Sequence, residues 1–219
     1  MSQRITATTH TLSNILEYKG EKILTYKIEY PQLASTASQK AVQRMNTYYR
    51  DKAKSFERYI YKTMYQQAAE QFDYAKENGY PIMVYEAEQV YNISYSSGRL
   101  ISLYTDQYTF TGGAHGSTIR TSQTWSLPRG YILPLKALFP PRFNYRAYII
   151  NTIIKEIELQ NAGGESVYFE DYIENVNRTF NEDSFYLTSK GIIIYFQQYD
   201  IAPYSTGIPE FLIPYLKRP

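Results

Sequence analysis

The sequence lacks cysteine, and it has only two histidines and one tryptophan in 219 residues. Without cysteine, the chain can form no disulfide bond, no catalytic thiolate and no cysteine-ligated zinc site. The histidines, His10 and His115, do not have the close spacing that His-based metal sites use. We therefore expect neither a metal nor another cofactor.

Long hydrophobic runs and a strong excess of one charge are also missing. The longest apolar run, Ile192 to Phe196, is far shorter than the ~20 residues of a transmembrane helix. Residues 1–10 are polar and do not resemble a secretory signal, so we expect a cytoplasmic protein if Met1 is the native start. The formal net charge of +2, without a dense basic cluster, argues against a nucleic-acid partner.

Tyrosine, in contrast, is abundant, with 25 residues against 10 phenylalanines. Its apolar ring and polar hydroxyl suit binding surfaces. Aromatic residues also cover β-sheets, and for any one tyrosine we favour that structural role.

The N-terminal residues predict a hairpin followed by a long helix. Leu12–Tyr18 and Lys22–Tyr30 are predicted as two strands around a turn at Lys19-Gly20, because apolar and polar residues alternate in the second of them. Pro31 is expected to end the second strand. Ser35 or Thr36 is expected to cap a helix that reaches Asn78-Gly79. Such a helix would be roughly 60 Å long, so we expect a break or a bend in it.

The middle of the chain predicts a β-meander. Its strands are Pro81–Tyr95, Leu100–Phe110 and Ile119–Trp125, with turns at Ser96–Gly98 and Gly112–Gly116.

Two helices and two strands are predicted after the meander. The helices are Asn144–Asn161 and Val167–Thr179, the latter with Phe169, Tyr172, Ile173 and Val176 facing inward. Gly191–Tyr199 is apolar on both faces and predicts a central strand, and a short last strand follows near Phe211–Tyr215. Because strands and helices are grouped, the sequence predicts an α+β fold, with mostly antiparallel sheets packed against one long and one or two shorter helices.

Few residues have a pattern that indicates catalysis. Glu86 and Glu88 are predicted to share one face of a strand about 7 Å apart, a separation that suits a glycosidase pair, but a solvated strand face is the commoner arrangement. His115 lies in a glycine-rich turn, where we favour a structural role over that of a general base. This turn lacks the phosphate-loop pattern and links two strands. We therefore predict no enzyme, and keep as the alternative a glycan-active, peptidoglycan-modifying enzyme that uses Glu86, Glu88 and His115.

The loop Asp200–Pro209 is the most suggestive binding segment, because it contains Pro203 and Tyr204 directly after the predicted central strand. Proline lowers the entropy lost when a loop binds. A rigid crossover with Tyr204 packed inward is an equally good interpretation of the same residues.

Four segments resemble one known family. Tyr108–Gly116, which includes Thr-Gly-Gly-Ala-His-Gly, resembles the hallmark of the RsiV-type extracytoplasmic domain family. Leu135–Phe139, Phe185–Thr188 and Gly191–Tyr204 resemble further segments of that family, in the same order. The N-terminal half resembles the companion domain that precedes it, which also occurs in PdaC-type peptidoglycan deacetylases. The resemblance implies a PdaC-like region at residues 1–110 and an RsiV-type region at residues 111–219.

The best-known members of this family are extracytoplasmic parts of anti-sigma factors that bind lysozyme. The resemblance therefore implies a non-catalytic, stand-alone binding module, located outside the cell, whose partner is a lysozyme-like protein or a cell-wall glycan. In the deacetylases, the catalytic residues lie in a separate domain that this sequence does not contain. The predicted ligand-binding residues are Tyr199, Asp200, Pro203 and Tyr204 in one loop, and Gly113 and His115 in the glycine-rich turn.

Overall fold

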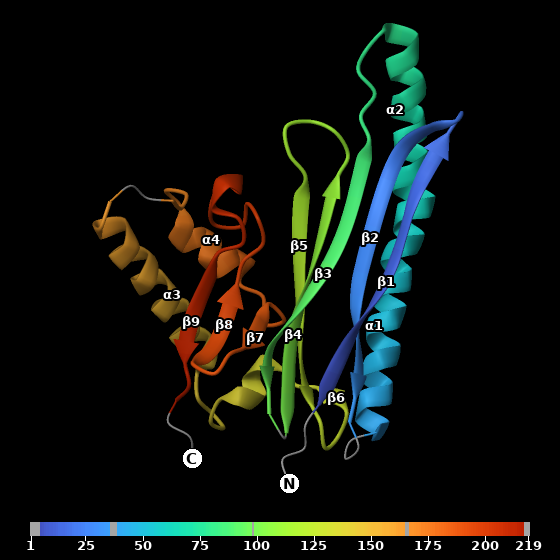
Figure 1. Ribbon diagram of the computed structural model, residues 1–219. Coiled ribbons are helices and arrows are strands. Elements are labelled where there is room, and N and C mark those ends of the chain that lie inside the picture. Colours follow the sequence, from blue (N-terminus) through green and yellow to red (C-terminus); the bar gives the residue numbers. More distant parts are fainter. Residues whose placement is uncertain (1–4, 36–38, 98, 165–166, 217–219) are drawn as a thin grey trace. The chain divides into compact units, whose positions relative to one another are not determined.

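The fold begins with the predicted hairpin, formed by β1 (Thr6–Tyr18) and β2 (Glu21–Ala34) (Figure 1). Lys19 and Gly20 between the strands both have positive φ, 51° and 82°, as a tight two-residue hairpin turn requires. The computed structural model describes residues 5–35, 39–97, 99–164 and 167–216.

The expectation that Pro31 ends the second strand is wrong. Strand β2 continues to Ala34, and Pro31 lies opposite Thr9 of β1. On its other side β2 pairs with β3 only over Leu24–Ile28. Proline has no backbone N–H to donate to a neighbouring strand. It is tolerated here because Pro31 lies beyond the residues of β2 that pair with β3.

The long helix spans α1 (Gln39–Tyr59), a π-helical turn η1 (Ile60–Met64) and α2 (Tyr65–Asn78). It ends at Gly79, whose φ of 70° is the left-handed conformation predicted for that glycine. Of the two proposed N-terminal caps, Ser35 precedes the helix without belonging to it, and Thr36 lies outside the described residues.

The expected interruption of this helix is the π-helical turn. The buried side chains around it recur at steps of four residues: Phe56, Ile60, Met64, Ala68 and Phe72. Four residues of an α-helix advance about 40° more than a full turn, so this stripe would drift away from the sheet. A π-helical turn holds more residues and compensates for the drift.

The remaining strands of the first sheet are β3 (Tyr85–Ser96), β4 (Leu100–Phe110), β5 (Ser117–Ser126) and β6 (Tyr131–Ile132). The sheet has the order β1-β2-β3-β4-β5-β6, so the predicted meander is confirmed. β2 and β3 pair in parallel, because the long helix between them acts as the crossover that a parallel pair needs.

Three short strands form a second sheet in the order β7-β8-β9: β7 (Phe185–Leu187), β8 (Gly191–Tyr195) and β9 (Glu210–Pro214). β8 is the central strand, as its two apolar faces predicted. Strand β7 was not predicted from the sequence.

Helices η2 (Leu135–Leu138) and α3 (Tyr145–Ala162) precede this sheet, and Asn144 caps α3 by accepting the Ala147 N–H at 3.2 Å. The predicted helix Val167–Thr179 is shorter than expected, because α4 spans only Tyr172–Thr179. Its residue Ile173 is 48% exposed, so its predicted inward orientation is wrong. The N–H of Phe169 bonds the carbonyl of Ile201 at 3.1 Å, which holds that part of the segment outside the helix.

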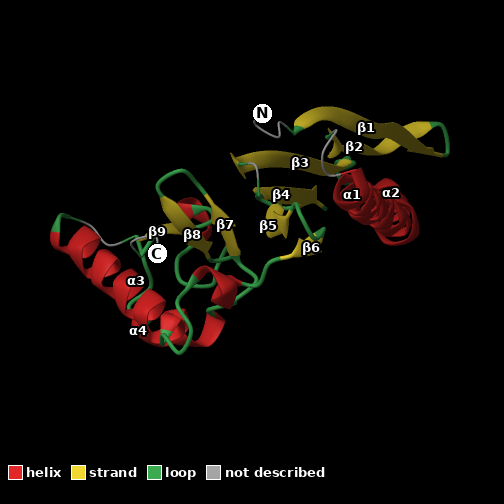
Figure 2. Cartoon of the chain, turned by 90° about the horizontal axis from the view of Figure 1, so that it is seen from below, coloured by secondary structure: helices red, strands yellow, loops and turns green. Residues whose placement is uncertain are grey.

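The chain divides into two compact units, whose helices and strands are drawn in Figure 2. Each unit has its own apolar core. Unit 1 consists of Met1–Tyr91, Thr105–Ile119 and Leu127–Gly130, and unit 2 of Asn92–Tyr104, Arg120–Ser126 and Tyr131–Pro219. β3, β4 and β5 each contribute residues to both units, and the division at residue 110 stays a prediction. Within the described ranges, no helix combines the length and apolarity needed to cross a membrane.

Candidate functional site

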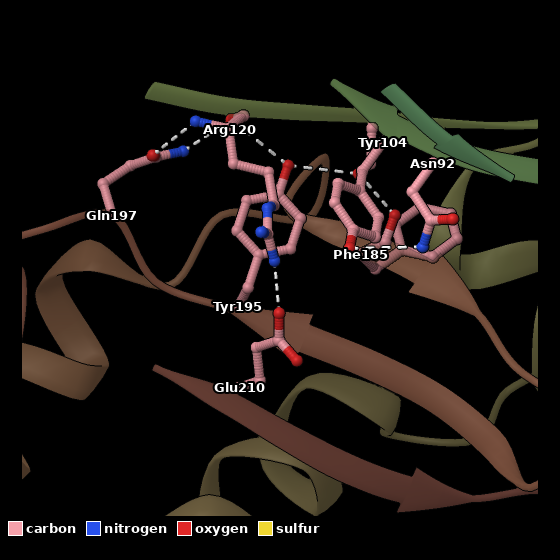
Figure 3. A network of polar contacts seen from close by, with 8 residues as sticks. Asn92, Tyr104, Arg120, Phe185, Tyr195, Gln197 and Glu210 are labelled. Atoms are coloured by element: carbon pink, nitrogen blue, oxygen red, sulfur yellow. Dashed lines mark hydrogen bonds and ion pairs between the residues drawn. The ribbon is translucent and has the colours of Figure 1, made fainter. Parts of the chain in front are cut away.

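A cluster of polar side chains is buried in unit 2 around Arg120 of β5 (Figure 3). The guanidinium of Arg120 forms an ion pair with Glu210 of β9. Its central carbon lies 4.0 Å from the ring centroid of Tyr104 and 5.8 Å from that of Tyr195. A guanidinium is planar and weakly hydrated, so it can stack on aromatic rings while it donates hydrogen bonds in its own plane. For this reason the fold accommodates the Arg120 cation, although its side chain is only 10% exposed.

Hydroxyl groups on β4 and β5 extend the same cluster. Ser102 Oγ accepts the N–H of Leu187 at 2.9 Å and lies 2.8 Å from Thr124 Oγ1. Ser122 Oγ donates to the carbonyl of Phe185 at 2.5 Å. All three hydroxyl-bearing residues are buried, and each has a partner, as buried polar groups require. These bonds give the backbone of the short strand β7 partners that a longer sheet would otherwise supply.

Tyr186 stacks near Tyr104, with ring centroids 4.8 Å apart. Burial raises the pKa of Tyr186, and the negative charge of Glu210 raises it further, so its phenol stays protonated at neutral pH. Tyr186 therefore keeps its phenolic proton within the cluster.

Gln197 connects the cluster to the loop after β8. The N–H of Arg120 donates to Gln197 Oε1 at 3.0 Å, and Gln197 Nε2 donates to the Arg120 carbonyl at 2.7 Å. The backbone N–H of Gln197 donates to Asp200 Oδ2 at 2.8 Å, and the N–H of Asp200 donates to the carbonyl of Gln197 at 3.1 Å. The start of the loop is thus tied to β5 and closed into a turn.

Asp200 and the residues after it anchor the loop in unit 2. Burial raises the pKa of Asp200, although the Gln197 N–H and the charge of Arg178 act against this. Ile201 and Ala202 are buried in the core. The loop is therefore fixed by burial as well as by hydrogen bonds.

The outer part of the loop presents aromatic rings. Tyr199 is 53% exposed and has a φ of 68°, and Tyr204 begins the short helix η3 (Tyr204–Thr206) after the exposed Pro203. The two tyrosine rings lie 6.1 Å apart between centroids, tilted by 33°. The structure thus brings Tyr199, Asp200, Pro203 and Tyr204 together in one loop. Tyr204 is half-buried, and its ring lies beside that of the exposed Tyr199.

The other two predicted ligand-binding residues, Gly113 and His115, lie in unit 1. Gly112 and Gly113 have φ values of 94° and 95°, which favour glycine, and a side chain at Gly116 would overlap the Tyr108 ring. His115 is exposed, and its Nδ1 lies 3.0 Å from the Gly116 carbonyl oxygen. The glycines are therefore accounted for by the turn itself, and a ligand at His115 stays a prediction.

Glu86 and Glu88 share one exposed face of β3, as predicted. In the parallel pairing with β2, Glu86 lies opposite Thr25 and Glu88 opposite Lys27. This environment is a solvated strand face with a neighbouring cation, and it gives neither carboxylate the desolvated surroundings of a general acid. Within the described part of the chain, no three His, Asp or Glu side chains gather closely enough to hold a metal ion.

The sequence did not identify Arg120, Gln197 or Glu210 as members of one cluster. One face of β5 buries Arg120, Ser122 and Thr124, whose polarity is typical of a solvated face, whereas Ile119 on the opposite face is 57% exposed. The abundance of tyrosine was the only available signal, because tyrosines form the rings around Arg120.

Two family models match separate parts of the chain. A model described as deacetylase PdaC matches residues 17–118, and one described as a protein of unknown function, DUF3298, matches residues 136–216. A PdaC domain and a DUF3298 domain are therefore found in the predicted order, while the finer RsiV-type assignment stays a prediction.

Solved structures show a similar fold. The crystal structure of a DUF3298 family member from Bacteroides fragilis has a TM-score of 0.71 and 18% identity, over 97% of this chain and 91% of that one. A DUF3298 family protein from Pseudomonas aeruginosa has a TM-score of 0.59 and 16% identity, with the same coverage of both chains. At these identities the likeness shows the fold alone. No curated protein matches the chain.

Proposed function

We propose that this protein is a non-catalytic binding module that recognises a lysozyme-like protein through the loop at Tyr199–Tyr204. The observation that carries the proposal is the paired tyrosine rings on a loop whose base is anchored in the core. A loop that is ordered before binding loses less entropy when its partner arrives. Tyrosine is also enriched among the residues that dominate binding energy at protein interfaces.

The support beneath the loop suits this role. Thr206 Oγ1 donates to the Val167 carbonyl at 3.1 Å, and the Gly207 N–H donates to the Tyr204 carbonyl at 2.9 Å. Gln197 ties the other end of the loop to β5. The rings can therefore contact a partner without the loop having to fold first.

The experiment is a calorimetric titration of the chain with a C-type lysozyme, combined with an assay of lysozyme activity. We expect heat of binding and inhibition of the enzyme. Tyr204→Ala should weaken binding by more than about 1 kcal/mol, because it removes one ring and uncovers the other. Gln197→Ala should also weaken binding, because the base of the loop loses its attachment to β5.

The matched control is Tyr74→Ala. Tyr74 and Tyr80 form a similar pair in unit 1, with centroids 5.9 Å apart and a tilt of 32°, and Tyr74 is 59% exposed. This variant should bind like the unmodified chain. If lysozyme produces no heat and no inhibition at high micromolar concentration, the lysozyme proposal is wrong. Release of acetate from N-acetylated peptidoglycan fragments, lost in Glu86→Gln, would instead favour the enzymatic alternative.

A further inference from the structure

A second surface of the protein has the composition of a ligand site, and it lies entirely within unit 1. Residues of the long helix, β4 and β5 line an open groove of ≈ 320 Å³. Its lining consists of Lys52, Ser55, Phe56, Tyr59, Gln107, Thr109 and Ile119. Aromatic, hydroxyl, amide and ammonium groups thus converge on a volume at the lower end of small-ligand pockets.

The apolar part of the groove has a fixed floor and an open wall. Phe56 is buried, whereas Tyr59 is 44% exposed, and the two rings are nearly parallel with centroids 6.3 Å apart. Ile119 on β5 is 57% exposed. A ligand with one apolar face could cover both exposed side chains and remove them from water.

The polar part of the groove includes an oriented amide. Gln89 is buried and donates from Nε2 to the Glu29 carbonyl at 2.9 Å, so its Oε1 must face the other way. Gln107 Nε2 donates to that oxygen at 2.8 Å. Because Nε2 of Gln107 donates to Gln89, the sheet fixes the orientation of this amide. Its Oε1, for which the described residues supply no donor, can accept a hydrogen bond from a ligand.

We propose that this groove binds a saccharide, with one sugar ring lying on Tyr59 and a hydroxyl or N-acetyl N–H donating to Gln107. A pyranose has both an apolar C–H face and a rim of groups that donate and accept, as the hydroxyls of Ser55 and Thr109 do. Among the residues that the structure describes, no carboxylate lines the groove and Lys52 is its one cation. A sugar that carries a carboxylate should therefore bind more tightly than a neutral one.

The proposal does not depend on lysozyme recognition, because its residues belong to unit 1 and the tyrosine loop belongs to unit 2. The experiment uses the full chain with two probes: neutral triacetylchitotriose, and the disaccharide of N-acetylglucosamine and N-acetylmuramic acid, which carries a carboxylate. Saturation-transfer NMR detects contact, and calorimetry measures affinity.

We expect both sugars to bind, and Tyr59→Ala to lower both affinities by about tenfold. Lys52→Ala should lower only the affinity for the carboxylated sugar. Gln107→Ala is the second test of the groove, and far-UV circular dichroism checks that each variant is folded. Tyr74→Ala, which alters an exposed tyrosine on the same helix outside the groove, and Tyr204→Ala should bind both sugars normally.

Absence of binding by both sugars at millimolar concentration would overturn the proposal. So would unchanged affinities in both Tyr59→Ala and Gln107→Ala, or a loss of sugar binding in Tyr204→Ala. Failure of lysozyme to bind, with sugar binding intact, would reject the proposed function and leave the groove standing.

Discussion

Each unit contains an ion pair surrounded by tyrosines, and the two pairs are buried in opposite senses. In unit 2 the cation is inside: the side chain of Arg120 is 10% exposed and that of Glu210 is 38% exposed. In unit 1 the carboxylate is inside: the side chain of Glu57 is 18% exposed and that of Lys54 is 50% exposed. The fold must therefore satisfy the buried member of each pair, while water can hydrate the exposed one.

The chemistry of the four side chains explains the difference. Arginine can be buried because its flat guanidinium stacks on Tyr104 while its N–H groups find acceptors. Lysine keeps its strongly hydrated ammonium at the surface, and only Nζ reaches Glu57, at 2.9 Å. Glu57 then receives its second hydrogen bond from the buried Tyr26 hydroxyl, also at 2.9 Å.

The largest expected effect comes from the buried cation. Glu210→Ala should destabilise the protein by about 3 kcal/mol, because it leaves the buried guanidinium of Arg120 without its counter-charge. Arg120→Met should cost clearly less, because it removes the buried charge itself and water can hydrate the partly exposed Glu210. Urea unfolding of both variants checks this order, and equal losses would contradict the comparison.

A smaller loss is expected from the hydroxyl groups that support β7. Ser102→Ala should cost about 2 kcal/mol, because the buried N–H of Leu187 loses its acceptor at 2.9 Å. The control is Ser13→Ala, which removes a hydroxyl from an exposed position of β1. If both serine variants unfold at the same urea concentration, the hydroxyl cluster does not support the strand as inferred.

The smallest effect is expected at Glu57, and it should depend on pH. Burial acts to raise the pKa of Glu57, but hydrogen bonds from Lys54 and Tyr26 outweigh it and hold the pKa below its usual value. A lowered carboxyl pKa stabilises the fold above the unfolded-state pKa, and this contribution is lost as pH falls through the native pKa.

Glu57→Gln should therefore be less stable than the unmodified chain at pH 7, by under about 1 kcal/mol, and equally stable well below pH 4. Urea unfolding at pH 7 and pH 3 measures the difference. A difference of the same size at both pH values would show that the charge of Glu57 is not its cause.

Much of the fold could be predicted from local patterns. Alternation and the Lys19-Gly20 turn gave the hairpin, steps of three and four residues gave the long helix, and the apolar run after Gly191 gave the central strand. These predictions succeeded because the patterns reflect which face of an element is buried. They failed for Val167–Thr179, where a tertiary hydrogen bond to Ile201 holds Phe169 out of the helix.

The candidate site could be predicted only in part. The sequence identified the loop through Pro203 and Tyr204, and the structure adds the pairing of Tyr204 with Tyr199 and the tie from Gln197 to β5. The saccharide groove was not foreseen, because Tyr59 and Gln107 lie on elements that are distant in sequence. Nothing in either local pattern indicates that they meet.

The sequence alone was enough to predict the α+β class, the order of most elements and the absence of thiol chemistry. The folded structure was needed to show that Arg120 is buried, that Gln107 lines a groove, and that Glu86 and Glu88 both lie on an exposed strand face. The physical reason is that periodicity records the average polarity of a face, whereas the burial of a charge depends on partners contributed by distant segments.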